Sequence, residues 1–302
     1  MLHMVNYRYM IIKENNQLNR LESRRIAIQK LEDLPTISLV LQKVLEIVNS
    51  DKASANDLAK LVSHDQSLMS IILKLVNSAF FGHMRKISSI HQATVILGFN
   101  TVKSIALGAT LFQPDKSGKG GDSIDRKALW LHSLATAQTS KFLAQIVSYP
   151  DPDEAYIGGL LHDLGKVVLD ITFPIEFQEA YQHTKKENKP IIDLEQEKIG
   201  IDHAEAGYIL LNKWQLPVAV AEGIRFHHSP DKAKITSKNL ASIINVSNHI
   251  SAILGFSIGI NNTPSELDEG AVECLKLKES HIERIIVEME EKKDEIVKFG
   301  TA

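Results

Sequence analysis

The chain has 302 residues, of which 44% are hydrophobic and 24% are charged, which is typical of a soluble globular protein with two lobes or domains. Its formal net charge of −3 gives no overall attraction to nucleic acid or to an anionic membrane surface. The single cysteine, Cys274, excludes an internal disulfide and suits a reducing cytosol.

The first third of the chain indicates a series of short helices. Residues 1–33 have mixed charge and predict a helical lead-in that packs on a neighbouring segment. Apolar residues then recur at three and four positions from Ile37 to Val48, which predicts an amphipathic helix. Ser54 followed by Asp57 resembles a capping box and predicts the start of the next helix.

The pair His64-Asp65 precedes a further helix, and we interpret Asp65 as its cap and His64 as a surface residue. Ser89 and Thr101 lie near the starts of two more helices, and no alternating strand pattern is visible. We therefore expect an all-α lobe over residues 34–113.

The clearest break in the chain is the segment 113–123, which has three glycines, a proline and mostly polar residues. Such a composition is typical of a flexible surface loop. We place the boundary between the two lobes there, and we expect a second helical lobe over residues 124–260.

The second lobe has its most informative residues at 158–170. Asp151-Pro152 is a strong helix start, and Gly165 is interpreted as the helix stop, so His162 and Asp163 fall in the last turn of a buried helix. An imidazole and a carboxylate in apolar surroundings are costly unless something pairs with them. Either a divalent metal is that partner, or His162 and Asp163 bond to each other while Lys166 forms a salt bridge.

Further histidines lie at inward-facing or helix-end positions of this lobe. His132 is on a long helix predicted for residues 124–146, and His203 follows the cap Asp202 on a helix whose same face includes Gly207. His227 and His228 complete an apolar stripe that includes Val220 and Ile224 and that Ser229-Pro230 ends.

The last part of the chain predicts a core helix from Leu240 to Phe256 and a helical tail over residues 261–302, whose residues 279–297 are charged and amphipathic. The apolar stretch 241–260 is interrupted by polar residues, Asn248 among them, so we interpret it as a core helix rather than a membrane span. With no secretory signal visible at the N-terminus, we expect a cytoplasmic protein.

Neutral imidazoles from several helices, together with a carboxylate, are the ligands that Fe, Mn, Zn and Ni sites use. We therefore predict a site for one or two divalent transition-metal ions. The candidate ligands are His132, His162, Asp163, His203, His227 and His228.

The second lobe resembles the HD superfamily of metal-dependent phosphohydrolases through His162-Asp163 and the spaced histidines. The span from Leu34 to about Phe256 is more similar to its HDOD branch, the HD-related output domains. The supporting segments are Leu34-Pro35, 75–82 with Asn-Ser-Ala-Phe-Phe-Gly, 87–98, Trp130 with His132, 159–166, 214–217 and His227-His228.

This resemblance implies an all-helical bacterial signalling or regulatory module that acts through protein contacts and commonly lacks demonstrated catalysis. The superfamily's last metal-ligating aspartate should lie on the helix from Leu240 onward, where the best-placed residue is Asn248, so this ligand position is degraded. A non-catalytic module with a partly retained metal site is the first hypothesis.

The alternative is a metal-dependent phosphohydrolase that acts on a nucleotide or cyclic dinucleotide. In that case a metal would activate water with Asp163 among its ligands, and Lys166 would steady a phosphate oxygen. The expected partners are unidentified signalling proteins, with a nucleotide ligand and a second copy of the chain as further possibilities; membrane and nucleic acid are not expected.

Overall fold

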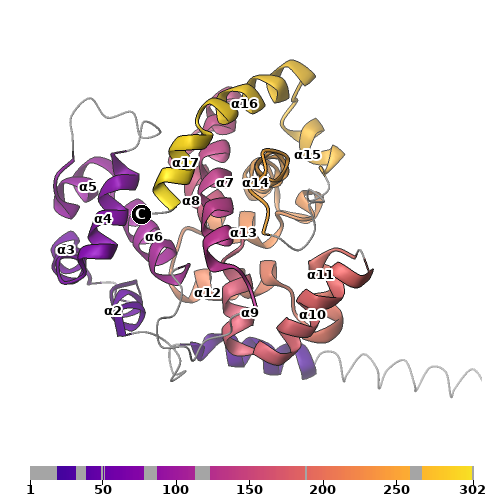
Figure 1. Cartoon of the computed structure of the whole chain (residues 1–302), viewed down its shortest axis with the longest axis horizontal. Helices are drawn as coiled ribbons and strands as arrows, with labels where there is room; N and C mark the ends of the chain where they lie inside the picture. The colour runs from indigo at the N-terminus through magenta and orange to yellow at the C-terminus, as the bar shows by residue number, and fades with distance from the viewer. Residues whose placement is uncertain are drawn as a thin grey trace, which may run out of the picture.

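The structure is a computed structural model, and all regular elements that it describes are helices (Figure 1). The all-α fold predicted from the sequence is therefore confirmed. The described residues are 19–31, 39–48, 50, 52–77, 87–112, 123–187, 189–258 and 267–300.

Five helices of the first half lie together on one side of the molecule (Figure 1). They are α2 (Leu39–Val48), α3 (Ala55–Ser63), α4 (Gln66–Val76), α5 (Ile90–Leu97) and α6 (Phe99–Leu111). An earlier helix at residues 19–29 lies apart from them, beside α9 and α10 (Figure 1). Ser54 and Asp57 form the predicted capping box of α3. Asp65 caps α4 by accepting a hydrogen bond from the Leu68 backbone N–H, and His64 is exposed, both as predicted.

The second half is built around α7, which packs against α8 and α14. Its elements are α7 (Arg126–Ile146), α8 (Pro152–Leu161), α9 (Leu164–Thr172), α10 (Pro174–Glu187), α11 (Ile191–Lys198), α12 (His203–Lys213), α13 (Val218–Arg225), the 3-10 turn η3 (Pro230–Lys232), α14 (Ile235–Ile253), α15 (Glu269–Cys274), α16 (Glu279–Glu291) and α17 (Lys293–Gly300). Asp151 caps α8 and Pro152 is in its first turn, as the sequence predicts.

The two halves share one continuous hydrophobic core, because α6 packs on both α8 and α9. The predicted boundary segment lies almost entirely outside the described residues, at 113–122. Most of the segment Asn-Ser-Ala-Phe-Phe-Gly also lies outside them, except Asn77, whose side chain hydrogen-bonds to the backbone N–H and carbonyl of Ile87. The domain limits therefore stay predictions.

The interpretation of Gly165 as a helix stop is wrong. Helix α8 already ends at Leu161, and Gly165 lies inside the next helix, α9. A Cβ at this position would stand 1.8 Å from the backbone oxygen of His203 and 2.9 Å from the backbone nitrogen of Gly207. Gly165 is therefore needed for the close approach of α9 and α12, which brings His203 toward Asp163.

The stripe that ends in His227 and His228 is not one continuous helix. Helix α13 ends at Arg225, and both histidines follow it in a turn. Asn245 of α14 donates a hydrogen bond of 2.9 Å to the backbone carbonyl of His227, so α14 holds this turn in place.

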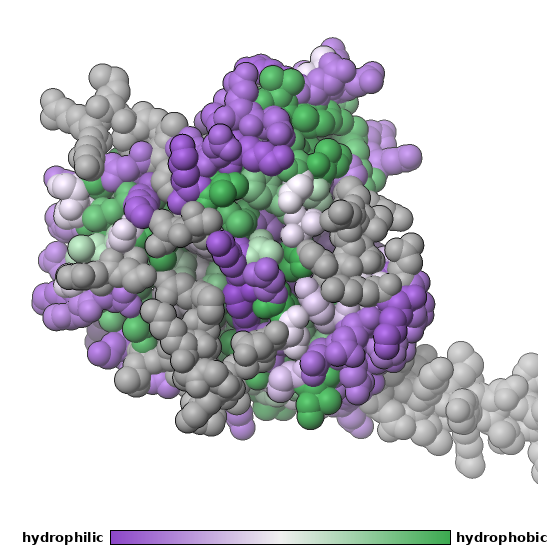
Figure 2. Space-filling model, viewed as in Figure 1, coloured by the Kyte–Doolittle hydropathy of each residue, from purple (hydrophilic) through white to green (hydrophobic). Residues whose placement is uncertain are grey.

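Both ends of the described chain pack on the second half. In the helix at residues 19–29, Arg24 forms an ion pair of 3.1 Å with Glu176 of α10. In the tail, Ile285 and Met289 of α16 and Ile296 of α17 are fully buried. Figure 2 shows hydrophilic side chains over α16 and α11, on the faces that these helices turn to solvent. None of the helices described here combines the length and hydropathy that a membrane span requires.

Candidate metal centre

All six predicted ligands lie in one region of the second half, although they come from four separate segments. His132 is on α7, His162 and Asp163 form the tight connection between α8 and α9, and His203 is the first residue of α12. His227 and His228 follow α13. His162, Asp163, His203 and His227 are completely buried, His132 is 3% exposed, and His228 keeps partial exposure.

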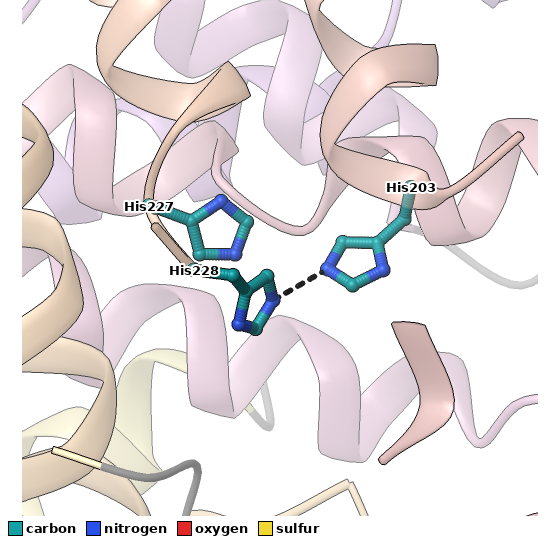
Figure 3. Close-up of side chains that lie close together, drawn as sticks. All are labelled: His203, His227 and His228. Carbon is teal, nitrogen blue, oxygen red and sulfur yellow. Dashed lines mark hydrogen bonds between the residues drawn. The ribbon is translucent and has the colours of Figure 1, made fainter. Parts of the chain in front are cut away.

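The ligand atoms form two groups, and within each group the atoms lie within 4.8 Å of one another. We call them the aspartate group and the three-histidine group. The aspartate group is His132, His162 and Asp163, and the three-histidine group is His203, His227 and His228. Figure 3 shows the three-histidine group, in which the rings of His227 and His228 lie with their centroids 4.0 Å apart and face His203.

Each of the four buried imidazoles has its Nδ1 occupied by an oxygen. The partners are backbone carbonyls for three of them: Phe256 for His132 at 2.6 Å, Gly159 for His162 at 2.8 Å and Ile224 for His227 at 2.6 Å. For His203 the partner is the Glu195 carboxylate at 2.6 Å. Since a carbonyl or carboxylate only accepts, each Nδ1 carries the proton and each Nε2 presents its lone pair.

These lone pairs converge on one another. The Nε2 atoms of His132 and His162 are 3.3 Å apart, and those of His203 and His228 are 2.9 Å apart. The Nε2 of His227 is buried and has no hydrogen-bond partner among the described residues. Two nitrogens bound to one ion at about 2.1 Å lie about 3.0 to 3.4 Å apart, so the spacing fits shared coordination.

Asp163 lies between the two groups and directs one oxygen toward each. Its Oδ2 is 3.5 Å from the Nε2 of His162 and 3.7 Å from that of His132, whereas its Oδ1 is 3.4 Å from the Nε2 of His203. The Oδ1 atom is buried without a hydrogen-bond partner in the described structure. A carboxylate in this position can contribute one oxygen to each group.

Lys166 forms the salt bridge that the sequence left open as an alternative to metal. Its ammonium donates a hydrogen bond of 2.7 Å to Asp163 Oδ2, and the lysine is 8% exposed. Burial acts to raise the pKa of Asp163, but His162, Lys166 and the other histidines outweigh it and hold this pKa well below its usual range. Asp163 is therefore an anion at neutral pH.

Burial also keeps four of the histidines neutral. It lowers the pKa of His162 to about 3, against the opposing effect of Asp163, and it lowers the pKa values of His132, His227 and His228. A neutral imidazole is the form that binds a metal ion. These rings therefore do not have to lose a proton before they can act as ligands.

Asn248 borders the aspartate group. It lies on α14, is 7% exposed, and its side chain hydrogen-bonds to His132, which acts to raise the pKa of that ring. An amide at this place offers an uncharged oxygen where a carboxylate would offer an anion.

Glu195 is a residue that sequence reasoning missed. It lies on α11, is completely buried, and its Oε2 accepts hydrogen bonds from both the backbone N–H and the ring of His203. The signal was present, because Ile191, Leu194, Glu195 and Ile199 share one helical face and a charged residue there is an exception to the apolar pattern.

The donor set fits a divalent transition metal. Imidazole nitrogens and one carboxylate are the ligands of Zn, Fe, Mn and Ni sites, and hydrogen bonds at each Nδ1 are the usual support of metal-bound histidine. Two buried donor atoms, His227 Nε2 and Asp163 Oδ1, have no hydrogen-bond partner among the described residues, so both are available as metal ligands. The ligand roles of individual residues stay predictions.

An all-helical fold with a buried centre of histidines around a His-Asp pair defines the class of HD-related proteins. The HDOD domain family matches residues 34–230, about two thirds of the sequence, and the chain belongs to this family. The resemblance stated from the sequence is thereby confirmed.

Individual relatives agree with this assignment. An uncharacterized protein of Treponema pallidum is 29% identical over 228 residues, which are 72% of this chain and 42% of that protein. The chain thus spans less than half the length of this curated relative. Two solved structures share the fold. A provisionally named phosphohydrolase of Shewanella amazonensis has a TM-score of 0.63 and 21% identity, and the match covers 91% of this chain and 97% of that one. A provisionally named signal transduction protein of Marinobacter aquaeolei has a TM-score of 0.65 and 21% identity, and the match covers 95% of this chain and 66% of that one.

Proposed function

We propose that this chain is a regulatory module of the HDOD type that acts through contacts with a signalling protein and retains an HD-type metal site with little or no turnover. The observation that carries the proposal is the imbalance of charge in the centre. Among the described residues, the two groups of donors share a single carboxylate, Asp163, while Asn248 beside His132 is uncharged.

The chemistry of this arrangement favours binding over hydrolysis. A divalent ion in such a centre would supply a water with a pKa near neutrality, and productive use of that water requires anions to orient it. Lys166 already holds Asp163 Oδ2 at 2.7 Å, so the aspartate group competes with an ammonium for its only anionic oxygen. We expect the three-histidine group to bind an ion more readily than the aspartate group.

The alternative function is a metal-dependent phosphohydrolase that acts on a nucleotide or cyclic dinucleotide. One specific observation favours it: Lys166 lies beside the donors and is not fully enclosed, so its ammonium can turn from Asp163 to a phosphate oxygen. In this reading Asp163 would support the attacking water and Lys166 would stabilise the negative charge that develops on the phosphate.

Metal analysis and an activity screen on the same preparation separate the two functions. We expect protein purified without added metal to retain a transition metal, and to show no turnover of bis(p-nitrophenyl) phosphate or of a cyclic dinucleotide with Mn²⁺ or Fe²⁺. Rapid metal-dependent turnover would establish the phosphohydrolase instead. A protein that stays metal-free after dialysis against Mn²⁺ or Fe²⁺ would rule out the retained site.

The variant Asn248→Asp tests the reason for which we expect no turnover. It restores an anion beside His132, so we expect hydrolysis of the same phosphodiesters to appear in this variant alone. The matched control is Asn212→Asp on the exposed part of α12, which makes the same chemical change away from the centre and should stay inactive. If Asn248→Asp binds metal and is still inactive, the missing carboxylate is not what prevents turnover.

A further inference from the structure

His203 has a different electrostatic partner from the other buried histidines. The rings of His132, His162 and His227 donate from Nδ1 to neutral backbone carbonyls, whereas His203 donates to the carboxylate of Glu195 at 2.6 Å. A carboxylate partner fixes the tautomer in the same way as a carbonyl, and in addition makes the opposite nitrogen a stronger donor.

Glu195 is also a buried carboxylate with few partners of its own. The side chain is completely buried, its Oε1 has no hydrogen-bond partner among the described residues, and its Oε2 is held only by His203. Taking an anion out of water costs several kcal/mol unless a positive charge compensates it. A divalent ion bound to the Nε2 of His203 would supply that compensation through the ring.

We propose that Glu195 is a positioning residue that completes a carboxylate–histidine–metal triad and sets the affinity of the three-histidine group for its ion. The inference rests on the proposed function, because it requires the retained metal site. It follows from the ligand chemistry: His203, His227 and His228 offer imidazole nitrogens alone, and Glu195 is the carboxylate that bonds directly to Nδ1 of one of these rings.

A purely structural role is the competing explanation. Glu195 Oε2 also accepts a hydrogen bond of 2.9 Å from the backbone N–H of His203, in the first turn of α12, and so joins α11 to the start of α12. Replacing Glu195 by glutamine distinguishes the structural role from the role in metal binding. Glutamine keeps an oxygen that can accept both hydrogen bonds, but it removes the carboxylate charge.

The test is the binding of Co²⁺ to the metal-free full chain, followed by calorimetry and by the visible absorption of the bound ion. We expect Glu195→Gln to bind Co²⁺ about 10- to 100-fold more weakly than the wild type at the three-histidine group and to shift the absorption bands. Its melting temperature without metal should stay close to that of the wild type, because the glutamine oxygen can accept the same two hydrogen bonds.

The matched control is Glu197→Gln, which makes the same change two residues along α11 at a side chain that is 53% exposed. This variant should bind Co²⁺ as the wild type does. Glu195→Asp keeps the charge with a shorter reach, so its affinity should lie between those of the wild type and Glu195→Gln.

The outcomes distinguish the inference from the function on which it rests. If wild type binds Co²⁺ and Glu195→Gln binds it equally well with the same spectrum, Glu195 is structural and the inference is overturned while the metal site stands. If Glu195→Asp binds more weakly than Glu195→Gln, hydrogen-bond geometry and not charge sets the affinity, which also overturns it. A wild type that binds no Co²⁺ overturns both.

Discussion

The protonation state of the buried histidines links the candidate site to the stability of the chain. His132, His162, His227 and His228 have folded-state pKa values below the ordinary value of 6.5, and burial is the largest cause for each. Below pH 6.5 these histidines therefore bind protons in the unfolded chain but stay neutral in the folded chain. As a result, the free energy of unfolding falls as the pH falls.

We predict a steep loss of stability between pH 7.5 and pH 5.5 for metal-free protein. A histidine that stays neutral when folded contributes about 1.4 kcal/mol of this loss at pH 5.5, and four such groups contribute up to four times as much. The carboxyl Asp163 has its lowered pKa far below this window and adds nothing to the slope there. Urea unfolding at several pH values measures the effect.

The variant His227→Asn provides the internal check on this prediction. Its amide can still donate to the Ile224 carbonyl, but it cannot titrate, so the loss between the two pH values should shrink by roughly one quarter. The control His183→Gln, at a partly exposed position of α10 outside the centre, should leave the slope unchanged. A free energy of unfolding that is flat over this range would mean that the rings titrate in the folded protein.

At the scale of elements, the site depends on how closely α9 and α12 approach. We predict that Gly165→Ala lowers the free energy of unfolding by about 3 kcal/mol, because the new Cβ would overlap the backbone of His203 and no flexible side chain can yield. The matched control is Gly108→Ala in α6, where a Cβ meets only the side chains of Leu160 and Leu161 at 3.4 to 3.6 Å.

Denaturant unfolding of both variants measures the contrast. An added methyl in a helix gains about 0.5 to 1 kcal/mol from propensity, so Gly108→Ala should be neutral or slightly stabilising. Equal stability of the two variants would show that α9 and α12 can separate without cost, and the role assigned to Gly165 would be wrong.

Local chemistry made the helix starts predictable from the sequence. Ser54, Asp65 and Asp151 each satisfy backbone N–H groups within three residues, and such bonds depend on nothing further along the chain. Helix ends were harder to predict. The role of Gly165 depends on His203, 38 positions later, and the sequence alone does not distinguish a glycine that permits close packing from one that ends a helix.

The candidate site was predictable in its histidines but not in its supporting groups. Histidines are few enough to be noticed as a set, and all five lie together with Asp163. The Nδ1 partners were not predictable, because three of them are backbone carbonyls, at Phe256, Gly159 and Ile224, which every residue possesses. Glu195 could have been found from its position on an apolar helix face.

At the scale of the whole molecule, the centre joins segments that are distant in the sequence. Its donors come from α7, the α8–α9 connection, α12 and the turn after α13, and α6 of the first half packs directly on α8 and α9. Ions bound in the two groups would join these four segments, so metal binding should favour the folded arrangement.

We therefore predict that Zn²⁺ or Mn²⁺ raises the melting temperature of the metal-free chain and that EDTA reverses the rise. A ligand that binds only the folded state stabilises it by about 2.7 kcal/mol at 100 times its dissociation constant. With an unfolding entropy of about 2.1 cal/mol/K per residue, a chain of 302 residues should gain about 4 °C. Differential scanning calorimetry across a metal titration measures this shift.

The variant His203→Gln decides whether the gain comes from the centre. It removes the nitrogen that faces both His228 and Asp163, so the metal-dependent shift should largely disappear. His183→Gln, which changes a partly exposed histidine outside the centre, should keep the full shift. An equal rise in both variants would place the stabilising ion elsewhere on the chain, because a site built on the converging Nε2 atoms cannot lose His203 and keep its affinity.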